Sequence, residues 1–407
     1  MLSKTEILKN IQFKTQNKNF LNIEKQNPFT IFDQKIIDFF DEISKKILKK
    51  QKLKKYPDLV SFGFFCRKVN LVTLSKLYLK ENCKRSGRGV SLHYPPTNVP
   101  LNFAYSLLVG LLSGNICLIR IGTNNFKQTN ELISIINIIL KKKKFTTLKK
   151  KIYIFNYLKS KKNINDYLSK ICDIRVIWGG NESINEIRNS KLQPHAYDIT
   201  FPNKISILVV NATEYLKCKE YLREAENFYN DTYTFDQNAC TSPRLIYWIG
   251  SKKNIYKARE IFWNSFVKII KKKSYVYGSI TGRLVKEMSA IIELKVKDSN
   301  KEISNKYSSL LLKKLPKNLS NYISPGGFFL EFCAKDFHQL RNIITIETQT
   351  ITILGYEVKP FYKSISSANY KGIFRIVKNG RASDFNLVWD GYDLIGQMSK
   401  RLNFISF

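Results

Sequence analysis

Short apolar segments alternate with amphipathic ones through the first half of the chain. Four runs are β-branched and apolar, as strands buried on both faces are: "ICLIRI" (116–121), "IYIF" (152–155), "IRVIW" (174–178) and "SILVV" (206–210). Two segments between them repeat apolar residues at helical spacing: "FKQTNELISIINIILKKKK" (126–144) and "INDYLSKI" (164–171). This alternation predicts a parallel sheet with helices on both faces, which is an α/β fold.

The segments before residue 116 are mainly helical in pattern. "FDQKIIDFFDEISKKIL" (32–48) places its isoleucines and Phe40 near one helix face, and residues 1–80 as a whole have a basic, helical pattern. "PLNFAYSLLVGLLSGN" (100–115) predicts a helix that begins after a proline and ends at Gly114.

The pattern changes after residue 211, which predicts a second α/β domain. Its expected helices cover 214–230 and 253–272, and its expected strands cover 244–250, 328–333 and 345–356. A further helix is expected over 389–404, packed back on the body of the protein. We therefore expect a first domain over 1–211 that includes the N-terminal helical region, a second domain over 212–385 and a returning C-terminal segment over 386–407.

The composition suits a large globular protein with reduced thiols. Of the 407 residues, 43% are hydrophobic, and the seven cysteines are irregularly spaced with no CxxC pair, so a zinc site or disulfide framework is not expected. This cysteine usage favours a cytoplasmic setting. The longest apolar run, 103–112, is too short to span a bilayer.

The net charge of +36 raises the question of a polyanion partner. The lysine runs at 45–55, 141–144 and 149–151 have the pattern of solvated helix faces and loops, and the chain has no recognition helix, RNP-type motif or zinc finger. A specific nucleic-acid partner is therefore not expected, whereas anionic small ligands suit this charge.

One cysteine lies in a polar loop rather than in a core segment. Cys240, in "FDQNACTSPR" (235–244), stands among small and polar residues, where a thiol is either incidental or a nucleophile. A nucleophilic thiol needs donors for the oxyanion that forms on attack. Asn98, in "YPPTNVP", could donate from a rigid proline-rich turn, or it could simply shape that turn.

A second candidate site follows the strand "IRVIW". Gly179 and Gly180 leave this strand and enter a helix, so backbone N–H groups at the helix N-terminus could bind a phosphate, although a glycine pair in such a turn is often only a turn. The dinucleotide fingerprint GxGxxG is absent at this point.

Seven segments in the same order, over roughly 87–400, resemble the acyl-CoA reductase family, the long-chain fatty acid reductases of bacterial luminescence systems. They are "GRGVSLHYPPTNVPLNF", "LLSGNICLIRIG", "VIWGGNESINEIR", "DITFPNKIS", "FDQNACTSPR", "TQTIT" and "NGRASDFNLVWDGYDLI". This family belongs to the aldehyde dehydrogenase superfamily. The resemblance implies an aldehyde-dehydrogenase-like fold, with a Rossmann-type parallel-sheet cofactor domain and an α/β catalytic domain.

The resemblance also implies roles for individual residues. Cys240 matches the nucleophile that accepts the acyl group, and Asn98 matches the asparagine that donates to the oxyanion. Gly179 and Gly180 match the turn that holds the cofactor pyrophosphate. Arg120 matches a lysine that contacts the cofactor ribose, and Thr123 lies in the same cofactor-binding segment, "RIGTNN".

Two departures from the superfamily pattern point to a reductase that uses NADPH. Thr200 stands where aldehyde-oxidising members carry the glutamate that activates water, so the acyl-enzyme should resist hydrolysis. The segment "RIGTNN" (120–125) carries an arginine and no carboxylate, and a carboxylate there would repel a 2′-phosphate. Glu347 could contact the nicotinamide ribose and His93 could touch the ligand, with a structural role favoured for both.

The expected function is therefore the NADPH-dependent reduction of a fatty acyl-CoA to the aldehyde, with release of CoA. The alternatives are an aldehyde dehydrogenase that works oxidatively and a basic polyanion-binding protein that retains the fold. The acyl donor could also be a partner protein, such as an acyl-protein synthetase or acyl-transferase subunit, and a homo-oligomer is expected.

Overall fold

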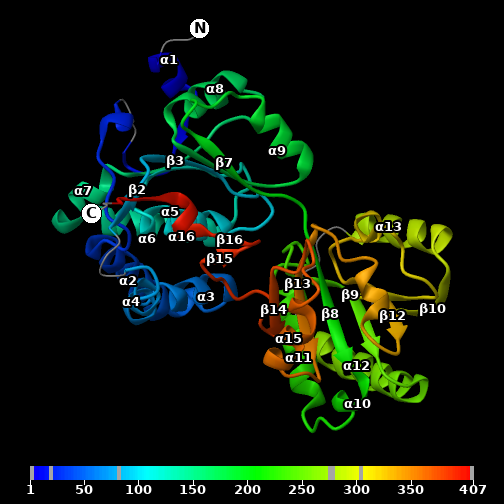
Figure 1. The fold of residues 1–407 in the computed structure, drawn as a ribbon. Helices are drawn as coiled ribbons and strands as arrows, with labels where there is room; N and C mark the ends of the chain where they lie inside the picture. The colour runs from blue at the N-terminus through cyan, green and yellow to red at the C-terminus, as the bar shows by residue number, and fades with distance from the viewer. Residues whose placement is uncertain (1–3, 18–21, 80–83, 274–279, 302–305, 404–407) are drawn as a thin grey trace, which may run out of the picture. The chain divides into compact units, whose positions relative to one another are not determined.

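The computed structural model describes residues 4–17, 22–79, 84–273, 280–301 and 306–403. The chain forms two compact units, each built around one main sheet (Figure 1). Unit 1 comprises Met1–Pro202 and Phe385–Phe407, and unit 2 comprises Asn203–Asp384. Both main sheets consist largely of parallel strands covered by helices, which confirms the predicted α/β class.

The main sheet of unit 1 has six strands in the order β1-β5-β4-β3-β6-β7. Only β1 runs antiparallel to its neighbour. The strands are β1 (Gln12–Phe13), β3 (Val90–Tyr94), β4 (Ile116–Arg120), β5 (Ile152–Asn156), β6 (Ile174–Trp178) and β7 (Tyr197–Phe201). Strands β3 and β5 are buried along their whole length, because helices cover both faces of the sheet.

The helices of unit 1 form two layers, one on each face of this sheet (Figure 1). Helices α2, α5 and α6 pack on one face, and α8 and α9 pack on the other. The helices are α1 (Lys4–Lys9), α2 (Gln34–Lys49), α3 (Pro57–Phe65), α4 (Lys68–Ser75), α5 (Asn102–Leu112), α6 (Lys127–Leu140), α7 (Thr146–Lys149), α8 (Lys162–Ile171), α9 (Asn181–Arg188) and α16 (Leu394–Met398).

Helix α2 shows why the predicted helices form where they do. The Asp33 side chain accepts a hydrogen bond from the Lys35 N–H at 2.8 Å and so caps the first turn. The apolar residues at helical spacing, Ile36, Ile43 and Ile47 among them, are buried against the core of unit 1. The helix ends at Lys49 within the lysine-rich segment 45–55, most of whose lysines are exposed.

The strand order of this sheet reverses between β3 and β6. From β3 the chain builds outward through β4 and β5, and it then returns to form β6 on the other side of β3. The loops after β3 and β6 therefore leave the carboxyl edge of the sheet in opposite directions. In open α/β sheets the crevice at such a point is where ligands bind.

The main sheet of unit 2 has seven strands in the order β10-β11-β12-β9-β8-β13-β14. The edge strand β10 is antiparallel and the others are parallel. The strands are β8 (Ile205–Asn211), β9 (Pro243–Ile249), β10 (Val296–Lys301), β11 (Ser308–Leu312), β12 (Phe328–Ala334), β13 (Thr348–Leu354) and β14 (Arg375–Lys378). Strand β8, which the sequence analysis assigned to the end of the first domain, lies between β9 and β13 in this sheet.

Two helices, α11 and α12, cover one face of the second sheet through an aromatic cluster that includes Phe228, Phe262 and Phe266. Leu340, Phe361 and other apolar residues cover the opposite face. The helices of unit 2 are α10 (Ala212–Tyr215), α11 (Tyr221–Tyr233), α12 (Lys252–Lys272), α13 (Ile280–Glu293), α14 (His338–Arg341) and α15 (Val358–Ser366). No helix in the described ranges is long and apolar enough to cross a membrane.

The helix predicted over 389–404 is wrong for most of its length. Strands β15 (Val388–Trp389) and β16 (Tyr392–Asp393) form a hairpin, followed by the short α16 and by β17 (Ser399–Arg401), which pairs with β2 (Arg85–Gly87). Asp390 and Gly391 form the turn with φ values of 49° and 81°. An Asp-Gly pair favours this tight hairpin turn, and the turn outweighs the helical spacing of the apolar residues.

Candidate active site

Cys240 lies in the loop between α11 and β9, at the amino end of the second sheet. Its side chain is half-buried. The Ser206 hydroxyl, at the start of β8, donates a hydrogen bond of 2.7 Å to the Cys240 carbonyl oxygen. The loop is therefore fixed to β8, an interior strand of the sheet, and its thiol is not part of a hydrophobic core.

Two residues in left-handed conformation turn the chain into this loop. Asp236 and Gln237 have φ values of 51° and 55°. Their N–H groups donate to the Tyr233 and Thr232 carbonyl oxygens at 3.1 and 2.7 Å, which closes the end of α11. Residues other than glycine pay an energetic cost for this conformation, and such costs concentrate at functional sites.

The Gln237 side chain offsets that cost by joining the loop to two strands. Its Oε1 accepts hydrogen bonds from the N–H groups of Gly327 and Phe328 at 2.8 and 3.1 Å. Its Nε2 donates to the carbonyl oxygens of Pro243 and Phe328 at 3.2 and 3.3 Å. The amide is fully buried. Gln237 therefore ties the loop that carries Cys240 to the first residues of β9 and β12.

The Cys240 thiol itself has a polar partner from another strand. Gln349, fully buried at the start of β13, donates a hydrogen bond from Nε2 to Cys240 Sγ at 3.2 Å. A buried amide among the β-branched residues of "TQTITIL" is costly unless it is hydrogen-bonded.

A buried arginine lies next to the same loop. The Arg244 guanidinium, on β9, donates to the carbonyl oxygens of Gln237 and Ser324. Burial lowers the pKa of Arg244 to about 10, while negative charge at Cys240 and Asp236 acts to raise it. Arg244 therefore stays protonated at neutral pH and places positive charge near the thiol.

Asn98 lies in an exposed turn that follows β3 in unit 1. The neighbouring loop and helix hold this turn in place. The Asn124 side chain donates to the Thr97 carbonyl oxygen at 2.9 Å, and the Thr129 hydroxyl donates to the Pro100 carbonyl oxygen at 2.8 Å. The predicted rigid setting of Asn98 thus comes from these hydrogen bonds as well as from the prolines.

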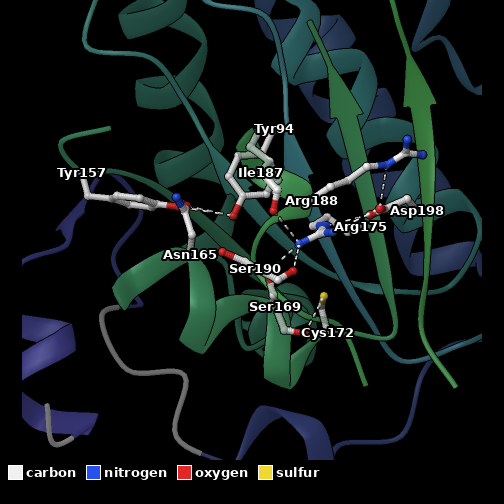
Figure 2. Close-up of polar contacts among 10 residues, drawn as sticks. All are labelled: Tyr94, Tyr157, Asn165, Ser169, Cys172, Arg175, Ile187, Arg188, Ser190 and Asp198. Atoms are coloured by element: carbon white, nitrogen blue, oxygen red, sulfur yellow. Dashed lines mark hydrogen bonds and ion pairs between the residues drawn. The ribbon is translucent and has the colours of Figure 1, made fainter. Parts of the chain in front are cut away.

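Arg120 ends β4 at the carboxyl edge of the first sheet. Its guanidinium lies 5.0 Å from the centre of the Tyr157 ring and donates from Nη2 to the Tyr157 carbonyl oxygen at 3.3 Å. The Tyr157 hydroxyl in turn donates to Asn165 at 2.5 Å (Figure 2). Burial raises the pKa of Tyr157 to about 12, so this hydroxyl keeps its proton. Thr123 follows in the exposed loop after β4.

Gly179 and Gly180 connect β6 to α9 at the same edge. The Gly179 N–H donates to the Phe201 carbonyl oxygen of β7 at 3.2 Å, and Gly180 is the N-cap residue of α9. Because Gly180 has no side chain, the N-cap residue itself gives the first turn no side-chain acceptor. The first-turn N–H groups of α9 can therefore serve an anion, as a phosphate site requires.

The opposite end of α9 is held by a buried arginine of β6. Figure 2 shows the Arg175 side chain among Ser169, Ile187, Ser190 and Asp198. Its guanidinium donates to the Ile187 and Ser190 carbonyl oxygens at 3.1 and 2.7 Å and forms a two-point ion pair with Asp198. Arg175 thus satisfies carbonyl groups at the C-terminus of α9 and fixes the helix whose N-terminus follows the glycine pair.

Three further residues that were considered for the site are Thr200, Glu347 and His93. Thr200 lies near the end of β7, half-buried. Glu347 precedes β13 and accepts a hydrogen bond from the Ser320 hydroxyl. His93 is fully buried in β3, where Nε2 contacts the Ser91 hydroxyl at 2.9 Å, and burial lowers its pKa to about 3.

The predicted residues thus fall into two groups. The carboxyl edge of the first sheet carries the residues predicted to bind the cofactor and the residue predicted to donate to the oxyanion: Arg120, Thr123, Gly179, Gly180 and Asn98. Cys240 belongs to unit 2. Asn98 and the glycine pair follow β3 and β6, the two strands at which the strand order of the first sheet reverses.

Comparison with known proteins identifies the family. The family model described as acyl-CoA reductase (LuxC) matches residues 77–401. This chain belongs to the acyl-CoA reductase family. The match covers all of unit 2, residues 77–202 and 385–401 of unit 1, and every residue proposed above for the site, Cys240 included.

The curated relatives that match this chain have low sequence identity to it. The long-chain acyl-protein thioester reductase of Aliivibrio fischeri is 22% identical over 333 residues, which is 79% of this chain and 64% of that protein. The protein of the same name from Vibrio harveyi is 22% identical over 325 residues, 78% of this chain and 64% of that protein. The matched part of this acyl-CoA reductase family member therefore spans less than two thirds of either relative.

Solved structures show the fold. The 1-pyrroline-5-carboxylate dehydrogenase of Thermus thermophilus aligns with a TM-score of 0.62 and 11% identity, over 91% of this chain and 81% of that one. The lactaldehyde dehydrogenase of Escherichia coli aligns with a TM-score of 0.60 and 13% identity, over 91% and 84%. The chain therefore has the aldehyde-dehydrogenase-like fold that the sequence analysis predicted.

Sequence reasoning missed three residues that contact the loop of Cys240 or belong to it: Gln237, Arg244 and Gln349. The first two lie within the quoted segment "FDQNACTSPR" but received no role, because nothing in their spacing shows that they are buried. The signal for Gln349 was available, since a glutamine within a β-branched strand needs a buried partner.

Proposed function

We propose that this acyl-CoA reductase family member reduces a long-chain fatty acyl thioester to the aldehyde, with NADPH, through an acyl group on Cys240. The observation that carries the proposal is the setting of Cys240. Its half-buried thiol accepts a hydrogen bond in a loop that is tied to three strands, which suits a nucleophile better than an incidental cysteine. Family membership supports the same reaction class.

Acyl transfer to Cys240 forms a tetrahedral oxyanion, which needs hydrogen-bond donors. We assign this role to the Asn98 side-chain amide and the Cys240 backbone N–H. A donor that acts only on the developing charge is worth about 3–4 kcal/mol of transition-state stabilisation. The thiolate is also a good leaving group, so the same residue serves acylation and the release of aldehyde.

Thr200 supports reduction over oxidation. A threonine cannot act as the general base that would deliver water to the acyl-enzyme. The acyl-cysteine would therefore persist until it is reduced.

The residues at the carboxyl edge of the first sheet suit a dinucleotide cofactor. The uncapped N-terminus of α9 beside Gly179 and Gly180 would hold the pyrophosphate, and Arg120 and Thr123 would lie towards the adenosine ribose. Arginine there, with no carboxylate in 120–125, favours the 2′-phosphate of NADPH. Bound NADPH would supply the hydride that reduces the acyl group.

The acyl donor is either acyl-CoA or an acylated partner protein. The family description names acyl-CoA, and the relatives from Aliivibrio fischeri and Vibrio harveyi are named for an acyl-protein thioester. Both donors present the same thioester carbonyl to Cys240. We propose that the net charge of +36 favours either the phosphates of CoA or an acidic acyl-protein partner, such as an acyl-protein synthetase or acyl-transferase subunit.

Acyl labelling tests the proposal directly. Wild-type protein incubated with long-chain acyl-CoA in the absence of NADPH should gain one acyl group on Cys240, read by peptide mass spectrometry. Addition of NADPH should then remove the label and release aldehyde. Cys240→Ala should show neither event, whereas Cys218→Ala, a control at another half-buried cysteine, should behave as wild type. A label on any other cysteine would overturn the assignment.

The cofactor preference is tested at Arg120. Wild type should have a lower KM for NADPH than for NADH, and Arg120→Ala should raise the KM for NADPH about tenfold or more while changing that for NADH little, because one charge-assisted contact is lost. Arg188→Ala, which removes an exposed arginine at the C-terminus of α9, is the matched control. Equal KM values for the two cofactors in wild type would contradict the preference.

A further inference from the structure

The geometry around Cys240 points to a role for Gln349 that the family resemblance does not supply. Gln349 Nε2 lies 3.2 Å from Cys240 Sγ, and the amide is fully buried at the amino end of β13. An amide N–H can only donate, so the sulfur is the acceptor in this contact. The contact joins a strand to a loop 109 residues away in the sequence.

A β-bulge aims Gln349 at the thiol. Strand β13 pairs with β8 through Thr348 and Ile205, and again through Ile351 and Ile207. Two residues of β13, Gln349 and Thr350, therefore stand opposite the single residue Ser206. Such a bulge re-aims a side chain, and bulges occur next to active sites.

Strand β9, which pairs with the other edge of β8, has a similar irregularity next to the same residue, Ser206. Strand β9 pairs with β8 through Pro243 and Ser206, and again through Leu245 and Ile207, so that Arg244 is the extra residue. The two irregularities direct Gln349 and Arg244 towards the loop that carries Cys240. Ser206, the residue between them, donates to the Cys240 carbonyl oxygen.

We infer that the Gln349 carboxamide stabilises the Cys240 thiolate, both before attack and when the aldehyde leaves. A thiolate accepts a hydrogen bond far better than a neutral thiol, so this donor favours the charged form. The inference rests on the proposed function, because it assumes that Cys240 is the nucleophile. Arg244 adds positive charge from the opposite side of Ser206.

The bond changes show where the donor acts. In acylation, the Sγ lone pair forms the S–C bond to the thioester carbonyl, and the C–S bond of the donor breaks with its electron pair on the donor thiolate. After reduction, the C–S bond to Cys240 breaks, the aldehyde C=O re-forms, and the electron pair returns to Sγ. The thiolate is present at the start and at the end, and Gln349 stabilises it at both points.

Alkylation of Cys240 by iodoacetamide tests the inference without substrate or cofactor. The rate at Cys240 is measured from pH 5 to 10 by peptide mass spectrometry, for native wild type and for the urea-denatured chain. The charged groups near the loop stay unchanged in every variant: Asp236 within it, Arg244, which donates to the Gln237 carbonyl oxygen, and Arg283, which donates to the Gly326 carbonyl oxygen. The midpoint, which is the pH of half-maximal alkylation rate, should be lower for the native protein than for the denatured chain.

Two variants of similar size separate the donor from packing. Gln349→Met keeps the length of the side chain without a donor, and it should raise the midpoint by about one pH unit, a tenfold loss of thiolate at neutral pH. Gln349→Glu, which keeps the shape of the side chain, should raise the midpoint further, because a carboxylate faces the thiolate. Thr352→Val is the matched control on the same strand. Its buried hydroxyl has no hydrogen-bond partner among the described residues, so the midpoint should not move.

The outcomes distinguish the two claims. A native midpoint equal to or above that of the denatured chain, or unchanged midpoints in both Gln349 variants, overturns the role of Gln349 even if wild type reduces acyl thioesters. The Gln349 variants could instead shift the midpoint as expected while wild type forms no acyl-Cys240. That result supports the thiolate donor and overturns the proposed function. If one Gln349 variant fails to fold, the other variant and the wild-type comparison still can overturn the role of Gln349.

Discussion

At the scale of single residues, the proposed chemistry depends on polar side chains in very different surroundings. Asn98 is exposed in its turn, Gln349 is fully buried, and the Cys240 thiol is half-buried. A buried donor is held in place before the substrate arrives, whereas an exposed one must be positioned by its loop. The hydrogen bonds of the turn, from Asn124 and Thr129, therefore help to hold Asn98 in place.

Asn98 should affect kcat much more than the binding of acyl-CoA. If its amide acts on the oxyanion, Asn98→Ala should lower kcat about 10²–10³-fold with a small change in KM. Asn98→Asp should be at least as severe, because a carboxylate would face the developing negative charge. The measurement is kcat per folded site, counted by alkylation of Cys240.

The control for Asn98 is its neighbour across the turn. Asn124→Ala removes the hydrogen bond to the Thr97 carbonyl oxygen and loosens the same turn, but it leaves the proposed donor in place. If Asn98 only shapes the turn, both variants should lower Tm alike and leave kcat within a few-fold of wild type. That result would remove Asn98 from the proposed mechanism.

At the scale of structural elements, the loop that carries Cys240, residues 234–242, is held by the ends of several strands. The loop bridges α11 and β9, its buried Gln237 amide reaches β12, and Gln349 reaches it from β13. Its two left-handed residues have an energetic cost that these hydrogen bonds offset. The position of the thiol is therefore set by several strands at once.

Gln237→Leu should destabilise unit 2 and impair the loop together. The substitution leaves the N–H groups of Gly327 and Phe328 without their side-chain acceptor, which should lower the free energy of unfolding by about 2–4 kcal/mol. Urea unfolding measures this loss. Acylation of Cys240 should slow in the folded fraction.

Gln237→Glu provides the graded comparison. A carboxylate still accepts from both N–H groups but cannot donate to the Pro243 and Phe328 carbonyl oxygens. Its unfolding free energy should fall between that of Gln237→Leu and wild type. Equal stability of all three proteins would show that the amide does not hold the loop.

At the scale of the whole molecule, two buried ionisable groups give the two units opposite responses to pH. His93 is in unit 1, and burial lowers its pKa from 6.5 to about 3. Asp231 is in unit 2, and burial raises its pKa from 3.8 to about 7 against the opposing effect of two backbone N–H bonds, from Gly380 and Ala382. The two shifts have opposite signs, so they largely cancel in a measurement on the whole chain.

The sign for each unit follows from proton binding. Between pH 3 and 6.5 the unfolded chain binds a proton at His93 that folded unit 1 does not, so unit 1 loses stability as the pH falls below 6.5. Between pH 3.8 and 7 folded unit 2 binds a proton at Asp231 that the unfolded chain does not, so its stability falls as the pH rises. Each slope approaches about 1.4 kcal/mol per pH unit.

Substitution of His93 or Asp231 separates their contributions to the pH dependence of stability. The stability of His93→Phe relative to wild type should increase as the pH is lowered from 7 to 5, and that of Asp231→Asn relative to wild type should decrease over the same range. Urea unfolding at several pH values measures both differences. A difference that is independent of pH for either variant would show that the corresponding group does not titrate as its burial requires.

Local pattern in the sequence was enough to predict several of the longer helices, several buried strands of both main sheets and the class of fold. Alternating apolar runs predicted β4, β5 and β6, and the cap and apolar face of α2 lie within its predicted segment. Such features depend on residues close together in the chain, so the sequence determines them directly. The polar loop around Cys240 and the proline-rich turn around Asn98 were visible for the same reason.

Tertiary structure alone decided what surrounds the thiol. The predicted C-terminal helix failed because an Asp-Gly turn and pairing with β2 outweighed apolar spacing. Strand β8 belongs to the second sheet because it pairs with β9 and β13. Both of these strands come later in the chain, so the pattern around β8 does not show the pairing. A parallel sheet pairs residues far apart in sequence, and a bulge of one residue changes which side chain faces the loop. Gln349 therefore meets Cys240 only because β13 folds beside β8 in that register, a relation that no local pattern contains.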